Sequence, residues 1–185
     1  MDKKYLAIFD LDGTLYDTSE VNYYAYQDAL ASFNVQLEKS FFISECNGKK
    51  YTEFLPRIVG NSGYIDEIHD LKKEAYHKNI YKARRNTHLF KMIEVMKQDY
   101  FISLVTTASR RNTFEILSFF EDEYLFDYII TQEDVEKVKP DPQGFLKAMS
   151  FFKTVADQTI IFEDSASGIK AAQLTGATVI AVKQF

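Results

Sequence analysis

The 185-residue sequence predicts an α/β fold in which a small helical domain is inserted into a core built on a five-stranded parallel sheet. Three observations predict it. Residues 6–9 are a run of four apolar residues, typical of a strand buried on both faces of a parallel sheet. Residues 16–84 show helical periodicity without a convincing alternating strand. From residue 88 onward helical and strand-like segments alternate, as in βαβ units.

The insertion is expected to contain helices at residues 21–33 and 65–82, where apolar residues recur three to four positions apart. Between them, breaks are expected at Asn47-Gly48, at Pro56 and at residues 60–63. The later elements are predicted as helices at 89–98, 111–120, 145–152 and 166–174 and as strands at 101–106, 128–131, 159–162 and 178–182. The chain thus divides into a core of residues 1–15 and 86–185 and a helical insertion of residues 16–85.

Composition excludes several classes of protein. A formal net charge of −5 and a pI near 5.3 argue against a nucleic-acid-binding face. The single cysteine, Cys46, excludes an intramolecular disulfide and a cysteine-built zinc site. No apolar run approaches the roughly 20 residues of a membrane span, and residues 1–4 lead into the first strand without a leader. We therefore expect a soluble cytoplasmic protein without nucleic-acid or membrane partners.

Two carboxylates follow the first strand directly. Asp10 and Asp12 stand one residue apart and precede Gly13, at the carboxyl end of a strand, where open α/β sheets bind ligands. Burying two carboxylates is costly unless a cation or hydrogen bonds compensate them. Mg²⁺ is the natural candidate, because it takes hard oxygen ligands and leaves places for water and phosphate.

Later strand ends supply further polar groups. Thr106 and Thr107 precede a helix, where a hydroxyl and backbone amides form an anion site, although such residues also cap helices generally. Lys139, taken alone, is explained as a surface lysine. The strand at 159–162 ends in a second acidic pair, Glu163 and Asp164. Four carboxylates at one sheet edge repel each other unless a cation lies between them, which favours a metal site.

These motifs, in this order, resemble the haloacid dehalogenase superfamily of Mg-dependent phosphotransferases. Residues 9–15 (FDLDGTL) resemble its first motif, and residues 139–142 and 162–172 resemble the branch that contains β-phosphoglucomutase and sugar-phosphate phosphatases. The resemblance covers roughly residues 4–15 and 86–182, and the insertion matches that branch's helical cap. It implies a Rossmann-like sheet in which the strand ending at Asp10 lies between those ending at Thr106 and Glu163.

The resemblance also implies roles for the first motif. Asp10 would be the nucleophile that forms an aspartyl-phosphate, and would bind Mg²⁺ through its other oxygen. Asp12 would protonate the leaving group and then activate water, while its backbone carbonyl binds Mg²⁺. This chemistry is coherent, because a carboxylate nucleophile needs no deprotonation at pH 7.

The resemblance implies that the remaining motifs bind the phosphate and the metal. Thr106 and the amide of Thr107 would hold the phosphoryl oxygens, and Lys139 would neutralise charge on Asp10 and the phosphate. Asp164 would complete the metal site, with Glu163 a ligand directly or through water. Metal and lysine together would compensate the charge that develops on the transferred phosphoryl group.

Three positions bear on the reaction. Asp12 argues against the dehalogenase branch, which lacks an acid there. Thr14 stands where β-phosphoglucomutases usually carry valine, and Asn22 stands where they carry a histidine. These differences favour a phosphatase that hydrolyses a small phosphomonoester, such as a sugar phosphate or similar metabolite. The alternative is a β-phosphoglucomutase-like phosphosugar mutase.

The insertion is expected to select the substrate. Lys49 falls in a loop that faces the active site in the family, where it would meet a second substrate group, although a solvated lysine pair with Lys50 explains it equally well. A weakly active regulatory or binding module remains a further alternative. The last strand, at 178–182, offers an edge for pairing, so we expect a monomer or a weak homodimer.

Overall fold

The computed structural model describes residues 3–60, 63–183 and 185, which form two compact units. One unit comprises Met1–Asp17 and Arg84–Phe185, and the other comprises Thr18–Ala83. The first unit extends two residues further at each junction than the expected core of residues 1–15 and 86–185. The reason is that residues 16–17 and 84–85 pair with each other as a short ribbon.

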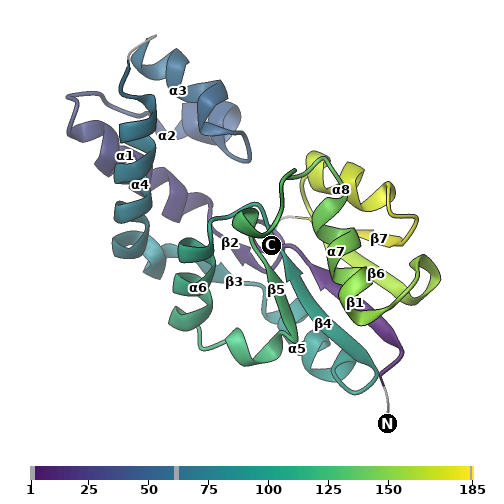
Figure 1. The fold of residues 1–185 in the computed structure, drawn as a ribbon. Coiled ribbons are helices and arrows are strands. Elements are labelled where there is room, and N and C mark those ends of the chain that lie inside the picture. Colours follow the sequence, from purple (N-terminus) through teal and green to yellow (C-terminus); the bar gives the residue numbers. More distant parts are fainter. Residues whose placement is uncertain (1–2, 61–62, 184) are drawn as a thin grey trace. The chain divides into compact units, whose positions relative to one another are not determined.

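A five-stranded parallel sheet forms the centre of the first unit, in the order β5-β4-β1-β6-β7 (Figure 1). Its strands are β1 (Tyr5–Phe9), β4 (Tyr100–Val105), β5 (Tyr128–Ile130), β6 (Thr159–Glu163) and β7 (Thr178–Ala181). The predicted α/β fold class is confirmed, as is the central position of the strand that ends at Asp10. β1 pairs with both β4 and β6, so Phe9 lies beside Leu104 and Phe162.

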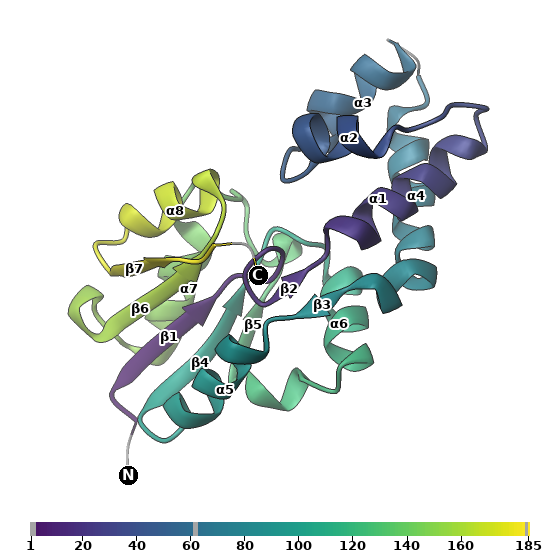
Figure 2. The same cartoon turned by 180° about the vertical axis from the view of Figure 1, so that it is seen from behind.

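Helices cover both faces of this sheet. Successive strand residues point to opposite faces, and Leu6 and Ile8 pack in one core cluster with Phe145 and Met149 of α7 (Gln143–Phe152) and Ala171 of α8 (Ala166–Gln173). Figure 2 shows α5 on the opposite face. The unit's other helices are α5 (Thr87–Met96), α6 (Arg110–Phe119) and the 3₁₀ turns η3 (Glu123–Leu125), η4 (Gln132–Asp134) and η5 (Ala156–Gln158).

A two-stranded antiparallel ribbon completes the first unit. It pairs β2 (Tyr16–Asp17) with β3 (Arg84–Arg85), so that Tyr16 lies opposite Arg85 and Asp17 opposite Arg84. The side chains of Arg84 and Asp17 also form an ion pair. The sequence does not predict this ribbon, because two residues are too few to show a strand periodicity.

The second unit is helical, and α1 and α4 lie side by side in it (Figures 1 and 2). Its elements are α1 (Ser19–Ala31), α2 (Lys39–Phe41), the π-helical turn η1 (Phe42–Cys46), α3 (Tyr51–Val59), α4 (Ile65–Asn79) and the 3₁₀ turn η2 (Ile80–Lys82). Aromatic side chains dominate its core, where Tyr26 packs edge-on against Phe54. The lone cysteine, Cys46, is buried in the same cluster.

The predicted break at Pro56 is wrong. Pro56 lies inside α3, where it removes one intrahelical hydrogen bond. Phe54 and Leu55 beside it are buried, and this burial holds the helix together. Of the predicted break at residues 60–63, positions 61 and 62 lie outside the described residues.

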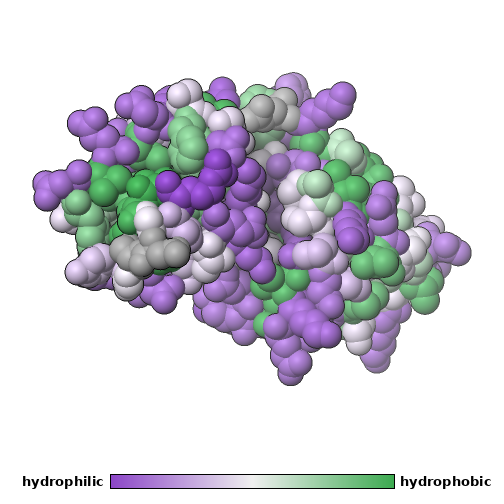
Figure 3. All heavy atoms as spheres, turned by 90° about the horizontal axis from the view of Figure 1, so that it is seen from above, coloured by the Kyte–Doolittle hydropathy of each residue, from purple (hydrophilic) through white to green (hydrophobic). Residues whose placement is uncertain are grey.

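One face of the protein mixes hydrophilic and hydrophobic residues. Figure 3 shows hydrophilic residues interspersed with smaller hydrophobic groups on one face.

β7 pairs with β6 alone among the described strands, and its Ile180 is 41% exposed. Within the ranges that the structure describes, no helix combines the length and apolarity needed to cross a membrane.

Candidate active site

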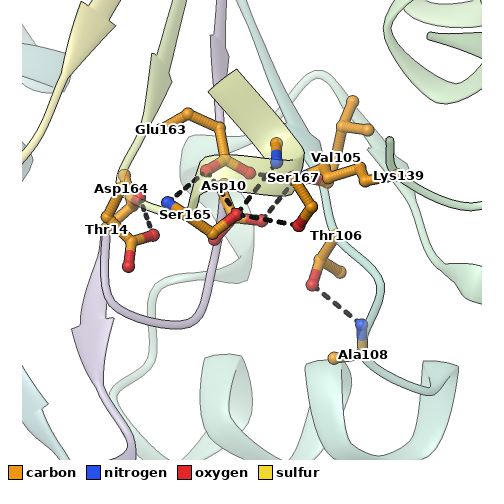
Figure 4. A network of polar contacts seen from close by, with 11 residues as sticks. Asp10, Thr14, Val105, Thr106, Ala108, Lys139, Glu163, Asp164, Ser165 and Ser167 are labelled. Carbon is orange, nitrogen blue, oxygen red and sulfur yellow. Dashed lines mark hydrogen bonds and ion pairs between the residues drawn. The ribbon is translucent and has the colours of Figure 1, made fainter. Parts of the chain in front are cut away.

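Lys139 lies at the centre of a buried polar cluster at the carboxyl edge of the sheet (Figure 4). Its ammonium donates to Asp10 Oδ1 at 2.5 Å, to Glu163 Oε1 at 2.7 Å and to the carbonyl oxygen of Val105 at 3.0 Å. An ammonium has three N–H donors, so these contacts use all of them. Lys139 thus joins the ends of β1, β4 and β6 through one charged group.

The sheet brings these groups together. β1 ends at Phe9 and β6 ends at Glu163, and the amide of Asp10 donates to the carbonyl of Phe162 at 3.0 Å. The rings of Phe9 and Phe162 stack with centroids 4.5 Å apart. The register of two buried strands therefore fixes the distance between the two acidic motifs.

Glu163 is held from two sides. While Oε1 accepts from Lys139, Oε2 accepts from the amide of Ser165 at 2.8 Å and from its hydroxyl at 3.0 Å. Ser165 also caps α8 by accepting from the amide of Gly168. A Cβ on Gly168 would lie 1.7 Å from Oε1 of Glu163, so only glycine leaves room for this carboxylate.

Asp164 faces the turn that follows the first motif. Its Oδ1 accepts from the hydroxyl of Thr14 at 2.9 Å. Gly13 has a φ of +87°, which favours glycine, and a Cβ there would lie 2.1 Å from Oδ2 of Asp164. The Asp164 carboxylate therefore lies against the backbone of the turn that carries Asp12.

The loop after β4 presents the predicted phosphate-binding groups. Thr106 is buried, and its hydroxyl accepts from the amide of Ala108 at 3.0 Å. Thr107 is exposed. Ser109 caps α6, and the first amide of that helix, on Arg110, donates to both carboxylate oxygens of Glu133. The carboxylate of Glu133 thus already lies at the N-terminus of α6.

The site carries more negative than positive charge. Burial raises the pKa of Asp10 well above its ordinary value against the opposing charge of Lys139, and the charges of Glu163 and Asp12 add to the rise. Burial also raises the pKa of Asp164 to about 6. Burial alone would lower the pKa of Lys139, but the two carboxylates it contacts raise it, so Lys139 stays protonated.

The donor set suits Mg²⁺. Asp10 and Asp164 offer hard carboxylate oxygens, and burial, together with the neighbouring carboxylates, raises the pKa of each. No group of three His, Cys, Asp or Glu side chains within the described residues is arranged around a common metal position.

The structure brings together most of the predicted core residues, namely Asp10, Thr106, Lys139, Glu163 and Asp164. Asp12, partly exposed, lies in the turn that follows Asp10. Lys49 belongs to the helical unit, where its ammonium lies 3.6 Å from Glu45, and its role toward substrate stays a prediction.

Glu163 is predicted as a metal ligand directly or through water, and this assignment stays a prediction. Both of its oxygens are engaged by Lys139 and Ser165, and the residue is only 1% exposed. The contacts of Ser165 with Glu163 and of Thr14 with Asp164 are not predicted from the sequence. The available signal is that Ser165 follows a strand and precedes a helix, as N-cap residues do.

Comparison with known proteins gives an independent assignment. A curated relative, a phosphorylated carbohydrates phosphatase from Thermotoga maritima, is 26% identical over 174 residues, covering 91% of this chain and 80% of the relative. Pyrophosphatase PpaX from Bacillus mycoides is 29% identical over 189 residues, covering 95% of this chain and 81% of its own. The crystal structure of CbbY from Rhodobacter sphaeroides in complex with phosphate shares the fold, with a TM-score of 0.84 and 21% identity over 98% of this chain and 87% of that one.

The family assignment rests on a match over almost the whole chain. The family model described as haloacid dehalogenase-like hydrolase matches residues 7–182, which include all four motifs at the sheet edge. The resemblance seen in the sequence is thereby confirmed at the level of the family. The chain belongs to the haloacid dehalogenase-like hydrolases.

Proposed function

We propose that this protein is a Mg²⁺-dependent phosphatase that hydrolyses a small phosphomonoester through an aspartyl-phosphate on Asp10. The observation that carries the proposal is the convergence of Asp10, Thr106, Lys139 and Asp164 at one buried sheet edge. The names of its relatives, which include a phosphorylated carbohydrates phosphatase and a pyrophosphatase, support a phosphate-bearing substrate.

The proposed reaction has two steps. In the first, a carboxylate oxygen of Asp10 attacks phosphorus, the bond from phosphorus to the leaving oxygen breaks, and Asp12 gives its proton to that oxygen. In the second, Asp12 takes a proton from water, the water oxygen attacks phosphorus, and phosphate leaves Asp10. Since Oδ1 of Asp10 is bound to Lys139, Oδ2 is the oxygen available for attack.

The other groups bind and compensate charge. Thr106 and the amide of Thr107 hold the phosphoryl oxygens, and Lys139 balances the charge of Asp10 and the phosphate. Mg²⁺ would be held by Asp10, by the backbone carbonyl of Asp12 and by Asp164, and when bound it supplies further positive charge to the phosphoryl oxygens. Glu163 orients Lys139 instead of binding the metal directly.

The test is phosphate release from a panel of sugar phosphates, nucleotides, phosphoglycolate and p-nitrophenyl phosphate, with Mg²⁺ and with EDTA. Asp10→Asn is the matched variant, because it preserves shape and removes the nucleophilic charge. Mg²⁺-dependent release that the variant lacks is the expected result.

Two other results would overturn the proposal. Conversion of β-glucose 1-phosphate into glucose 6-phosphate without free phosphate would make the protein a mutase. A folded protein that binds Mg²⁺ and turns over no substrate of the panel would favour a binding or regulatory module.

A further inference from the structure

A second buried polar cluster lies away from the catalytic carboxylates, and we call its three residues, Tyr16, Arg85 and Asp122, the ribbon clasp. Asp122 is 2% exposed and follows α6. Its Oδ2 accepts from the hydroxyl of Tyr16 at 2.6 Å and from Nε of Arg85 at 2.8 Å, and its Oδ1 accepts from Nη2 of Arg85 at 2.5 Å. The bidentate contact with Arg85 is the geometry that gives a strong charge-assisted pair.

The clasp fastens both strands of the ribbon with one carboxylate. Tyr16 of β2 lies opposite Arg85 of β3, so their side chains share a face. The Tyr16 ring is fully buried, with its centroid 5.3 Å from that of Phe90 and 5.1 Å from that of Phe120. The Arg85 guanidinium lies 3.8 Å from the Phe90 ring centroid. Ring packing and hydrogen bonds therefore both hold the Tyr16 side chain in one position.

The backbone of Tyr16 closes the turn that carries Asp12. Its carbonyl accepts from the amide of Gly13 at 2.7 Å, and its amide donates to the carbonyl of Leu11 at 3.0 Å. A β-bridge joins Tyr16 to Asp12 itself. A displacement of Tyr16 must therefore displace the turn and, with it, the Asp12 side chain.

The opposite strand supports the same turn. Asn86, the residue after Arg85, donates its amide to the carbonyl of Leu15 at 2.8 Å and its side-chain Nδ2 to the carbonyl of Thr14 at 3.2 Å. Both strands of the ribbon thus lead from Asp122 to residues 11–15. A buried ion pair adds little net stability compared with apolar packing, so stability alone is a weak explanation for this arrangement.

We propose that Tyr16, Arg85 and Asp122 are positioning residues that hold the turn at residues 11–15, and so keep Asp12 within reach of the leaving-group oxygen. The inference rests on the proposed role of Asp12 as general acid and base. In the hydrogen bonds described above, the side chains of the three contact none of the groups proposed to bind phosphate. Their loss should therefore slow the chemical step more than it weakens substrate binding.

The experiment compares Tyr16→Phe and Asp122→Asn with a control, Asp127→Asn. Asp127 is a matched carboxylate at the amino end of β5, where its Oδ2 accepts from the amide of Ile102 at 2.8 Å and from Lys3 at 3.0 Å. Turnover of the best substrate is measured at saturating Mg²⁺. We expect kcat to fall about tenfold in the two clasp variants, with KM within about twofold of wild type. The control should keep its kcat at a comparable loss of Tm.

Two further measurements keep the test decisive. Asp122→Asn leaves the Arg85 charge uncompensated, so the double variant D122N/R85Q replaces the ion pair by a neutral pair if the single variant does not fold. Amide exchange at Gly13, read by NMR, should be faster in Tyr16→Phe than in wild type and needs no turnover. An inactive wild type would therefore overturn the proposed function while leaving the clasp testable.

Unchanged Gly13 exchange in Tyr16→Phe would overturn the inference. So would a kcat that falls no further in Tyr16→Phe and D122N/R85Q than in the Asp127 control, because the clasp would then only stabilise the fold.

Discussion

Glu163 and Lys139 form a buried ion pair with 2.7 Å between Oε1 and Nζ, and the same ammonium contacts Asp10. The proposed nucleophile therefore shares its positive partner with a carboxylate that has no proposed covalent role. Because Oε2 of Glu163 is bound to Ser165, the pair is oriented from α8 as well as from the sheet. The position of Lys139 depends on both sides of the cluster.

Removal of the shared ammonium should abolish most activity. In Lys139→Met, Asp10 and Glu163 lose their common partner, and we expect kcat for phosphate release to fall about 100-fold or more. Breaking a buried pair also costs about 3 kcal/mol of unfolding free energy, measurable by urea titration. Lys137→Met is the control, since Lys137 is exposed in the same loop. Wild-type kcat in Lys139→Met would refute the assigned role.

The two acidic residues after β6 should respond differently to Mg²⁺. Asp164→Asn removes a proposed ligand and should raise the Mg²⁺ concentration for half-maximal activity at least about tenfold. Glu163→Gln should change that concentration by less than about threefold, because the side chain faces Lys139 and Ser165. Magnesium titrations of phosphate release check both values. A larger effect in Glu163→Gln than in Asp164→Asn would identify Glu163 as a direct ligand.

Gly168 should not accept a methyl group. A Cβ there overlaps the Glu163 carboxylate, so Gly168→Ala should lose about 1–3 kcal/mol of unfolding free energy although alanine favours helices. Gly63→Ala is the control, because a Cβ at Gly63 meets no atom of the described part of the chain within 4 Å. Urea unfolding of both variants gives the comparison. A Gly168→Ala protein as stable as wild type would contradict the close packing at α8.

Acid should weaken the helical unit through His69. Burial lowers the pKa of His69 to about 4, with the charges of Lys73 and Lys72 adding to the effect, while its unfolded value is 6.5. Between these values the unfolded chain binds more protons than the folded one, so His69 contributes stability near pH 7 that is lost as the pH falls toward 4. His69 also stacks on Tyr51, with centroids 3.7 Å apart, and its Nδ1 lies 3.1 Å from the hydroxyl of Tyr26.

The measurement for His69 is a comparison with His69→Gln, which cannot titrate. The Tm advantage of wild type over the variant should shrink between pH 7 and pH 5. Loss of the stacking contact lowers the Tm of the variant at every pH. The change of the Tm difference with pH therefore reports the protonation of His69. An advantage that stays constant or grows in acid would show that His69 is not buried in its neutral form.

The sequence predicts the sheet well because its strands are short, continuous apolar runs. The run at residues 6–9 has no alternation, as a strand with neighbours on both sides and helices on both faces requires. Acidic residues directly after two such runs must then meet at one edge. This is why the cluster of Asp10, Glu163 and Asp164 is predictable without any structure.

Side-chain orientation is less accessible to sequence reasoning. Whether Glu163 points to a metal or to Lys139 depends on a hydrogen bond from Ser165 and on the space left by Gly168, neither of which changes the pattern of apolar residues. The clasp is hidden for a similar reason, because Tyr16, Arg85 and Asp122 are far apart in the chain. Pairing over such separations leaves no local periodicity.

The ribbon has a consequence for how the chain can vary. Asp17 and Arg84 lie opposite each other, so the segment from Thr18 to Ala83 leaves and re-enters the first unit at adjacent points. For a flexible segment, each doubling of length between two such fixed ends costs only about 0.6 kcal/mol of closure entropy. A segment of different size or sequence can therefore be grafted between the two strands while the sheet edge, with Asp10 and Lys139, keeps its own supports. The insertion is therefore exchangeable, because the β2–β3 ribbon already holds the two chain ends to which it is joined.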